Sequence, residues 1–256
     1  MSDDQIFHLL QFVPTQEIAD NYFKKTFYLK NAIEYREMEE KNVSSSDSNL
    51  KFDKLEGKIK NWSILQNCLF ISCFTMLSNE DFKTGKLDPQ LIKTLDNGNV
   101  DNVGNKSARP FITINANNLK KLLNNLKCQV DSYLCKNNLN SSGLFTRKVI
   151  YLDKTQYEKK SSTLEQMITP LGQFIDSNTT KISLTCENYV LLEKILKHIY
   201  LTKLNYFSGQ REYRLGVALD DPIEKKELVI PIINDLSNYV RVHSYEAFSN
   251  LKLKDL

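Results

Sequence analysis

Residues 69–76 read LFISCFTM, and this run decides the fold that the sequence predicts. β-Branched and aromatic side chains dominate it, which favours a strand in the middle of a sheet. Apolar runs on either side predict further strands at residues 5–13 (QIFHLLQFV), 27–33 (FYLKNAI), 110–115 (PFITIN) and 148–152 (KVIYL). The run at 5–13 has few polar residues, so we expect that strand to be buried on both faces or nearly so.

Helices are predicted between these strands. Thr15 is placed to cap a short helix that runs to Lys25, with Ile18, Tyr22 and Phe23 on one face. A strong helix follows the strand at 110–115, and an amphipathic helix is predicted at 187–201. The strong helix has apolar residues at helical spacing: Leu119, Leu122, Leu123, Leu126, Val130 and Tyr133. Strands and helices mix without regular βαβ alternation, which predicts an α+β fold.

Near the end of the chain the sequence predicts a hairpin. A loop at residues 206–209 leads into a strand at 210–219, which we expect to pair with a strand at 227–232 across the turn at 220–222. Loops are expected near residues 41–52, 96–108 and 136–143, which are rich in Ser, Asn, Asp and Gly. No repeat or linker divides the chain, so we expect residues 1–256 to form a single domain.

The composition excludes several classes of protein. With 256 residues, 41% hydrophobic and 25% charged, the chain is typical of a globular protein. No stretch approaches the ~18 consecutive apolar residues of a membrane span, and the start MSDD lacks the basic region of a signal peptide. We therefore expect a cytoplasmic protein without a membrane partner. A net charge of +3, with only six arginines, argues against a dedicated nucleic-acid-binding protein.

Several kinds of catalytic site are also excluded by motif. The five cysteines form no CxxC pair, so we expect packing residues or free thiols and no metal site. The sequence contains no GxGxxG, GxxxxGK, GxSxG or HExxH, the motifs of Rossmann, P-loop, hydrolase and zinc-protease sites.

Four segments in this order carry a resemblance. They are residues 6–14 (IFHLLQFVP), 27–57 (from FYLKNAIEYREMEE to FDKLEG), 70–75 (FISCFT) and 203–215 (KLNYFSGQREYRL). Together they resemble the ADP-ribosyltransferase-like domains of a large bacterial and phage family long catalogued as a domain of unknown function. The resemblance spans about residues 5–235. It implies a mixed, mostly antiparallel split sheet flanked by helices, with NAD as co-substrate and no metal.

The resemblance also implies site residues. Glu212 would be the catalytic carboxylate that stabilises the oxocarbenium-like state of the ribose. Gln210, two residues earlier, would project to the same face of the strand and orient the accepting group. Tyr206 and Phe207, on the loop just before, would contact the target.

Residues that hold NAD are implied on other segments. His8 on the first strand would grip the cofactor, and Ser72 and Thr75 on the central strand would hold the catalytic carboxylate and the nicotinamide ribose. Arg36 and Arg214 are candidates for the pyrophosphate, because a guanidinium binds two phosphate oxygens at once.

Each of these residues also has a purely structural interpretation. Glu212 could be a surface carboxylate paired with Arg211 or Arg214. His8 could be a core histidine whose ring nitrogens are satisfied by other protein groups, and Arg36 could belong to a solvated charged face. Ser72 and Thr75 are ordinary residues of a strand.

The resulting functional hypothesis is an NAD-dependent mono-ADP-ribosyltransferase that modifies a protein or nucleic acid, as a toxin, phage-defence or anti-defence effector. Such a toxin would need a neutralising antitoxin or immunity partner. The alternative is a catalytically silent binding module of the same fold that senses a nucleotide or inhibits a partner. The missing proline in FDKLEG, and a single tryptophan, Trp62, favour that alternative. A third possibility, an assembly protein, would use the leucine-rich helix as an interface.

Overall fold

The computed structural model describes residues 7–32, 68–97, 108–153, 155–156, 159, 201–221 and 223–256. The strands are β1 (His8–Phe12), β2 (Thr26–Asn31), β3 (Leu69–Leu77), β4 (Phe82–Lys83), β5 (Lys86–Leu87), β6 (Phe111–Ile114), β7 (Ser141–Lys148), β8 (Ile150–Leu152), β9 (Thr202–Leu204), β10 (Glu212–Leu219), β11 (Glu227–Pro231) and β12 (Val240–His243). The α-helices are α1 (Gln16–Asn21), α5 (Pro89–Asn97) and α6 (Ala116–Lys136), and the 3₁₀ helices are η2 (Asn79–Asp81), η4 (Asn205–Gln210), η5 (Ser237–Tyr239), η6 (Tyr245–Asn250) and η7 (Leu253–Asp255).

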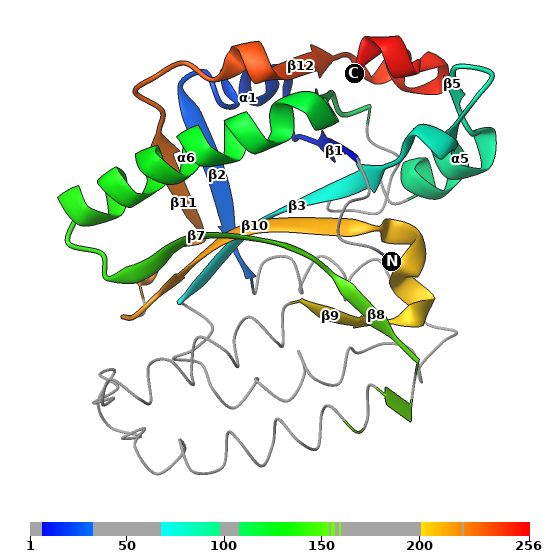
Figure 1. The fold of residues 1–256 in the computed structure, drawn as a ribbon. Coiled ribbons are helices and arrows are strands. Elements are labelled where there is room, and N and C mark those ends of the chain that lie inside the picture. Colours follow the sequence, from blue (N-terminus) through cyan, green and yellow to red (C-terminus); the bar gives the residue numbers. More distant parts are fainter. Residues whose placement is uncertain are drawn as a thin grey trace.

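One eight-stranded antiparallel sheet organises these elements (Figure 1). Its main path runs β11-β2-β3-β1-β6-β12, while β10 pairs with β3 and β7 pairs with β10. The described residues also form two small sheets, β4-β5 and the parallel pair β8-β9. The prediction of an α+β fold with a mostly antiparallel sheet flanked by helices is confirmed.

The sheet forks at β3. One edge of β3 pairs with β10 from Leu69 to Thr75. The other edge is shared by two strands, since β2 pairs at Phe70 and Ile71 and β1 pairs from Thr75 to Leu77. The strand predicted to be central is therefore central, and β1 and β2 diverge from each other along it.

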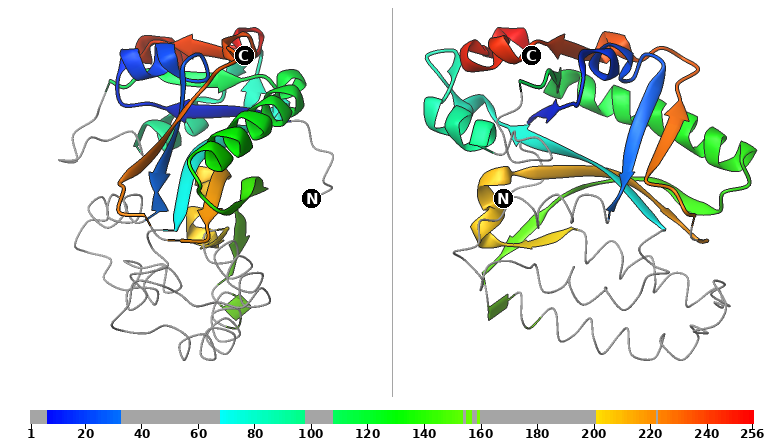
Figure 2. Two further views of the ribbon diagram at one scale, coloured as in Figure 1. Left: turned by 90° about the vertical axis from the view of Figure 1, so that its left-hand side faces the viewer. Right: turned by 180° about the vertical axis from the view of Figure 1, so that it is seen from behind.

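The two faces of the sheet are covered by different elements. Helix α6 lies across one face (Figures 1 and 2), where its buried leucines pack against residues of β1, β3 and β10. These are the leucines that the third hypothesis assigned to an oligomer interface, and they belong to the core instead. On the other face, α5, η6 and η7 cover a second apolar cluster that contains Leu10, Leu77 and Phe111.

The start of the chain folds largely as its local signals predict. Thr15 is the N-cap of α1, and its Oγ1 accepts a hydrogen bond from the Ile18 N–H at 3.3 Å. The helix ends at Asn21 rather than at Lys25, because the chain turns through Phe23 with a positive φ of 58°. The positive φ lets the Phe23 N–H and the Thr26 carbonyl bond at 2.8 Å and redirects the chain into β2.

The predicted hairpin between residues 210–219 and 227–232 is wrong. Strand β10 is buried on both faces and has β3 and β7 on its two edges, so it has no edge left for β11. Strand β11 pairs with β2, at the far end of the sheet. Two further elements were missed. Residues 141–148 form β7, whose first three residues fall in the predicted loop at 136–143, and residues 89–97 form α5, whose last two residues fall in the predicted loop at 96–108.

Other expectations fall outside the described residues, namely the loop at 41–52, most of the loop at 96–108 and all but the last residue of the helix at 187–201. Within the described part of the chain, no helix is both long enough and apolar enough to cross a membrane.

Candidate functional site

Glu212 lies at the first position of β10 and is 8% exposed. Its Oε1 accepts a hydrogen bond from Lys203 Nζ at 2.7 Å. Its Oε2 receives the guanidinium of Arg214, from Nε at 2.8 Å and from the terminal nitrogen at 2.7 Å. One carboxylate and two cations therefore form a cluster, here called the Glu212 cluster, with both cations almost completely buried.

Alternation along β10 brings Arg214 to the carboxylate. Residues two apart on a strand project to the same face, and the face opposite α6 carries Glu212 and Arg214 while Tyr213 and Leu215 enter the core beneath α6. Lys203 comes from β9, which pairs in parallel with β8 next to the start of β10. Two strands, β9 and β10, thus supply the two cations that meet at one carboxylate.

The cluster holds Glu212 ionised. Burial by itself would raise the pKa of this carboxyl, but the charges and hydrogen bonds of Arg214 and Lys203 outweigh burial and lower the pKa to about 2. An ionised carboxylate accepts about four hydrogen bonds. The Arg214 contacts occupy Oε2, whereas Lys203 is the single described donor to Oε1. The described contacts therefore leave an acceptor position on Oε1.

Gln210 reaches the same cluster by a different route from the one predicted. It is the last residue of η4, not a strand residue, so the period-2 argument does not apply to it. Arg211 turns the chain with a φ of 47°, and the Gln210 side chain accepts a hydrogen bond from Lys203 Nζ at 3.2 Å. Arg211 itself forms an ion pair of 2.6 Å with Asp81, which anchors this turn to η2.

Tyr151 of β8 supports the start of β10. Its hydroxyl oxygen accepts the backbone N–H of Glu212 at 2.9 Å. Burial, followed by the negative charge of Glu212, raises the pKa of Tyr151 to about 12. The phenol therefore stays neutral at physiological pH and keeps an O–H donor next to the carboxylate.

The predicted cofactor-binding residues of the central strand separate onto two faces. Thr75 is the direct cross-strand partner of Glu212, so the two side chains share a face. Ser72, three residues earlier, points to the other face, where its hydroxyl bonds with Tyr22 at 2.9 Å and accepts from Gln11 at 3.0 Å. Ser72 is consequently not brought to Glu212, because alternation along β3 turns it away.

His8 occupies β1 and links two neighbouring elements. Its Nδ1 accepts the backbone N–H of Ala116 at 3.1 Å, at the start of α6. Its Nε2 lies 3.0 Å from Asn79 Oδ1 and is therefore the protonated nitrogen that donates. Both ring nitrogens are thus engaged in holding the fold, as the structural interpretation of this residue expects.

The remaining predicted site residues are placed only in part. Arg214 is buried within the Glu212 cluster, where its guanidinium holds a carboxylate. Tyr206 and Phe207 lie in η4, four and three residues before Gln210, and their side chains lie outside what the structure describes. Arg36 also lies outside the described residues.

Two residues of the cluster were missed by sequence reasoning. Lys203 is the first residue of the segment 203–215. A lysine in a sequence usually indicates a solvent-exposed position, so it was not assigned to the site. Tyr151 lies in the predicted strand KVIYL without any signal of its own. Both reach Glu212 through the β8-β9 pairing, which joins residues about fifty positions apart and leaves no local pattern.

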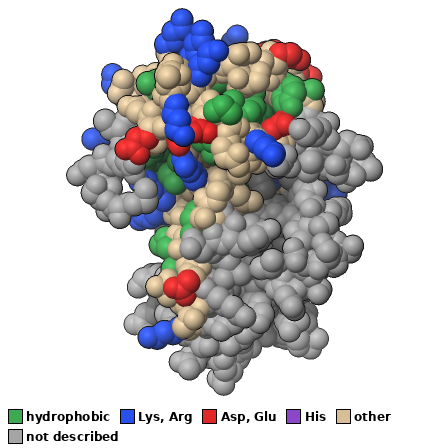
Figure 3. All heavy atoms as spheres, turned by 90° about the vertical axis from the view of Figure 1, so that its right-hand side faces the viewer, with side chains coloured by type: hydrophobic (Ala, Val, Ile, Leu, Met, Phe, Trp, Pro, Cys, Tyr) green, Lys and Arg blue, Asp and Glu red, His purple; other side chains and the backbone are tan. Residues whose placement is uncertain are grey.

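The described surface and side chains add little to these candidates. Lys and Arg are interspersed with Asp and Glu on the face seen in Figure 3, so no continuous basic field marks it. Among the residues that the structure describes, no three His, Cys, Asp or Glu side chains gather where they could hold a metal ion. The four described cysteines form no disulfide with one another.

Comparisons with known proteins identified no relative: no protein-family model, curated protein or solved structure matches this chain.

Proposed function

We propose that this chain is an NAD-dependent mono-ADP-ribosyltransferase that acts in the cytoplasm on a macromolecular acceptor. The observation that carries the proposal is the adjacency of the three motif-bearing strands. Strand β3, with its SCFT motif, lies between β1 and β10, and Thr75 has Leu10 as its partner on one side and Glu212 on the other. The three strands that carry the resemblance along the sequence are thus neighbours in the sheet.

The chemistry of Glu212 supports the same proposal. Cleavage of the bond between nicotinamide and ribose develops positive charge on the sugar, and a carboxylate fixed in advance stabilises that charge. Glu212 is ionised, and among the described residues Lys203 is the single donor to its Oε1, which leaves an acceptor position there for a ribose hydroxyl. Gln210, which bonds to the same lysine, is close enough to orient an acceptor beside it.

The burial of the cluster favours a second candidate function, a catalytically silent module that binds a nucleotide or inhibits a partner. Both oxygens of Glu212 already hold cations, and a carboxylate used in this way is a stabilising counter-ion.

The test follows free nicotinamide after the purified protein is incubated with NAD and cell lysate. Wild type is expected to release nicotinamide, and Glu212→Gln, checked for folding by circular dichroism, is expected to lose this activity by about 10²–10³-fold. Exposed Glu224 supplies the matched control, Glu224→Gln, which should behave as wild type.

A second variant keeps the test interpretable if Glu212→Gln does not fold. Gln210→Ala leaves the three charges in place and should still release nicotinamide while it transfers less labelled ADP-ribose to protein or nucleic acid. Nicotinamide release by neither wild type nor any variant would overturn the enzyme. Binding of labelled NAD without release would then support the silent module, and absence of binding would contradict both functions.

A further inference from the structure

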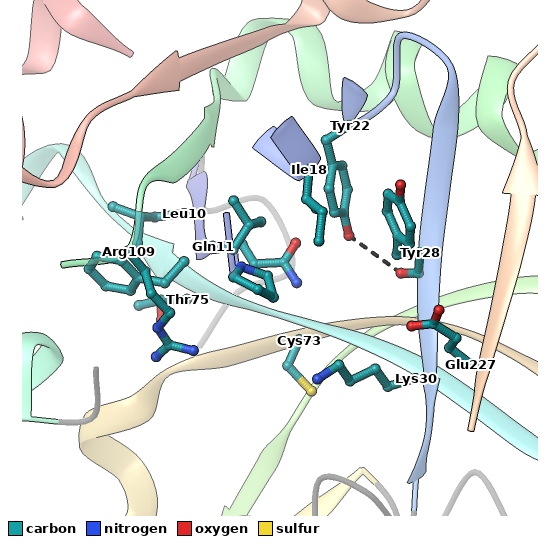
Figure 4. A pocket seen from close by; sticks show the side chains of 13 residues that line it. Leu10, Gln11, Ile18, Tyr22, Tyr28, Lys30, Cys73, Thr75, Arg109 and Glu227 are labelled. Atoms are coloured by element: carbon teal, nitrogen blue, oxygen red, sulfur yellow. Dashed lines mark hydrogen bonds between the residues drawn. The ribbon is translucent and has the colours of Figure 1, made fainter. Parts of the chain in front are cut away.

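A cavity of about 230 Å³ opens at the fork of the sheet (Figure 4). Among the described strands, β2 pairs with β3 as far as Ile71 and β1 pairs with it from Thr75 onward, so this edge of β3 has no partner between these two residues. Residues of β1, β2, β3 and α1 surround the opening. The volume is below the ~300–1,000 Å³ of sites for drug-sized ligands. The cavity therefore has room for a single ring and not for a whole dinucleotide.

One side of the cavity is apolar. Pro14 and Ile18 line it together with the rings of Tyr22 and Tyr28, whose centroids are 5.8 Å apart. Figure 4 shows that Ile18 and Tyr22 project into it in the same direction. The Tyr22 hydroxyl is engaged within the protein, because it bonds with Ser72 Oγ at 2.9 Å. This side therefore offers aliphatic and aromatic surface, which favours contact with an apolar or aromatic group.

The other side carries two cationic side chains, Lys30 and Arg109. Lys30 is the cross-strand partner of Ile71, and Cys73 lies two residues further along β3, so the three side chains share one face of the sheet. Figure 4 shows Lys30 extended from β2 toward Cys73, and Arg109 beside Thr75 across the cavity. The two cations thus approach the cavity from different sides.

Lys30 is the cation that is available to a ligand. Its cross-strand partner on β11 is Glu227, the single carboxylate among the described residues that line the cavity. Lys30 forms no ion pair with a carboxylate of the described residues, and Glu227 is exposed, so water screens the charge of Glu227. Arg109 has other contacts, but a guanidinium has five N–H donors and can also donate to a ligand. A carboxylate placed beside Lys30 would accept charge-assisted hydrogen bonds.

We propose that this cavity, here called the fork site, binds a small monocarboxylate with an apolar body, such as an aromatic acid. Lys30 binds the carboxylate, and Ile18, Tyr22 and Tyr28 contact the apolar body. The inference does not depend on the proposed function, because Glu212 is not among the described residues that line the fork site.

The first experiment titrates wild-type protein with benzoate, by calorimetry and by NMR, beside three compounds that each lack one of its features. Benzamide has the ring without the charge, acetate has the carboxylate without the ring, and inorganic phosphate is an anion that is not a carboxylate. Benzoate should bind with a dissociation constant of about 1 mM or tighter, and the other three compounds at least about tenfold more weakly.

Two variants and a control assign the binding to named residues. Lys30→Met keeps the length of the side chain and removes its charge, so benzoate should bind about tenfold more weakly while benzamide is unchanged. Exposed Lys25, just before β2, gives the control Lys25→Met, which should bind benzoate as wild type does. Ile18→Trp fills the apolar side and should abolish benzoate binding. Circular dichroism checks folding, and the partly buried Lys30 gives an interpretable variant even if Ile18→Trp does not fold.

Cys73, on the lining, reports whether benzoate occupies the fork site. In reduced protein, alkylation by iodoacetamide is followed at each cysteine by peptide mass spectrometry. At ten times its dissociation constant, benzoate occupies about nine-tenths of the sites and should slow alkylation of Cys73 about tenfold. Exposed Cys128 and Cys135 of α6 are internal controls, and their alkylation rates should not change.

Four results would overturn the fork site. They are failure of benzoate to bind wild type at millimolar concentration, binding of benzamide, acetate or phosphate as tight as that of benzoate, unchanged benzoate binding by Lys30→Met, and benzoate binding that leaves the alkylation of Cys73 unchanged.

Discussion

Replacement of Glu212 by Gln tests the central electrostatic argument most directly. Gln keeps the shape of the side chain and removes its charge, so Lys203 and Arg214 would both lose the carboxylate that they share. The Lys203 side chain is only 1% exposed, and it has little access to water in compensation. Removal of one partner from a buried ion pair costs about 3–5 kcal/mol, a large part of the ~5–15 kcal/mol that stabilises a typical domain.

The lowered pKa of Glu212 gives a second magnitude for the stability that the ion pairs provide. Its fall from 4.5 to about 2 corresponds, at about 1.4 kcal/mol per pH unit, to about 3 kcal/mol of stability. Because the folded-state pKa lies below the unfolded value, this stabilisation is fully present above pH 4.5. It is lost as the pH falls toward 2. The two routes give the same order of magnitude.

The assay is urea denaturation of wild type, Glu212→Gln and the exposed control Glu224→Gln at a series of pH values from 7 to 2.5. Glu212→Gln should lose about 3–5 kcal/mol at pH 7 and show a shallower loss of stability below pH 4.5 than wild type. Addition of Lys203→Met to Glu212→Gln removes the buried lysine that has lost this carboxylate and should recover part of the loss. A Glu212→Gln protein within about 0.5 kcal/mol of wild type at pH 7, with an unchanged acid slope, would refute the reasoning.

Three further substitutions test the scaffold by the same denaturation assay. Gly216→Ala would bring a Cβ to 2.9 Å from the carbonyl oxygen of Phe70 and should cost about 1–3 kcal/mol of stability. The control Gly209→Ala meets only ordinary contacts and should change stability little. Equal effects of the two substitutions would contradict the packing argument. His8→Phe loses two hydrogen bonds and should cost about 1–3 kcal/mol, and a protein as stable as wild type would argue against the structural role. Asp81→Asn weakens the ion pair and the cap at η2 and should cost about 1–2 kcal/mol; an unchanged midpoint would show that the turn before β10 is held by other contacts.

The elements that the sequence predicted are those whose own residues determine them. Strand β3 is an apolar run, α6 repeats its leucines at helical spacing, and Thr15 caps α1 with its own hydroxyl. Helix α5 also had a local signal, because Asp88 precedes Pro89 and its carboxylate accepts the Gln90 N–H at 2.7 Å. Strand β7 had none, since SSGLFTRK shows neither alternation nor an apolar run, and it is a strand because β10 pairs with it.

The contacts of the candidate site also divide into those that local sequence determines and those that depend on long-range strand pairing. Glu212 and Arg214 are two residues apart on one strand, so their contact follows from alternation, and alternation also separates Ser72 from Thr75. Lys203 reaches Glu212 only because β8 and β9 pair in parallel, and a pairing between residues about fifty positions apart is a property of the whole fold. The sequence therefore predicted the carboxylate of Glu212 and did not predict Lys203, which donates a hydrogen bond to it.

The carboxylate that the proposed transfer reaction needs is shared with two buried cations. Lys203 and Arg214 both bind Glu212, so the carboxylate presents a weaker negative field to a cationic sugar than an unshared carboxylate would. A bound pyrophosphate would attract the two cations and leave the carboxylate to act on the ribose. On the proposed function, the phosphates of NAD are therefore part of the catalytic electrostatics as well as of binding. Nicotinamide riboside, which has no phosphate, would then be a poorer donor than NAD.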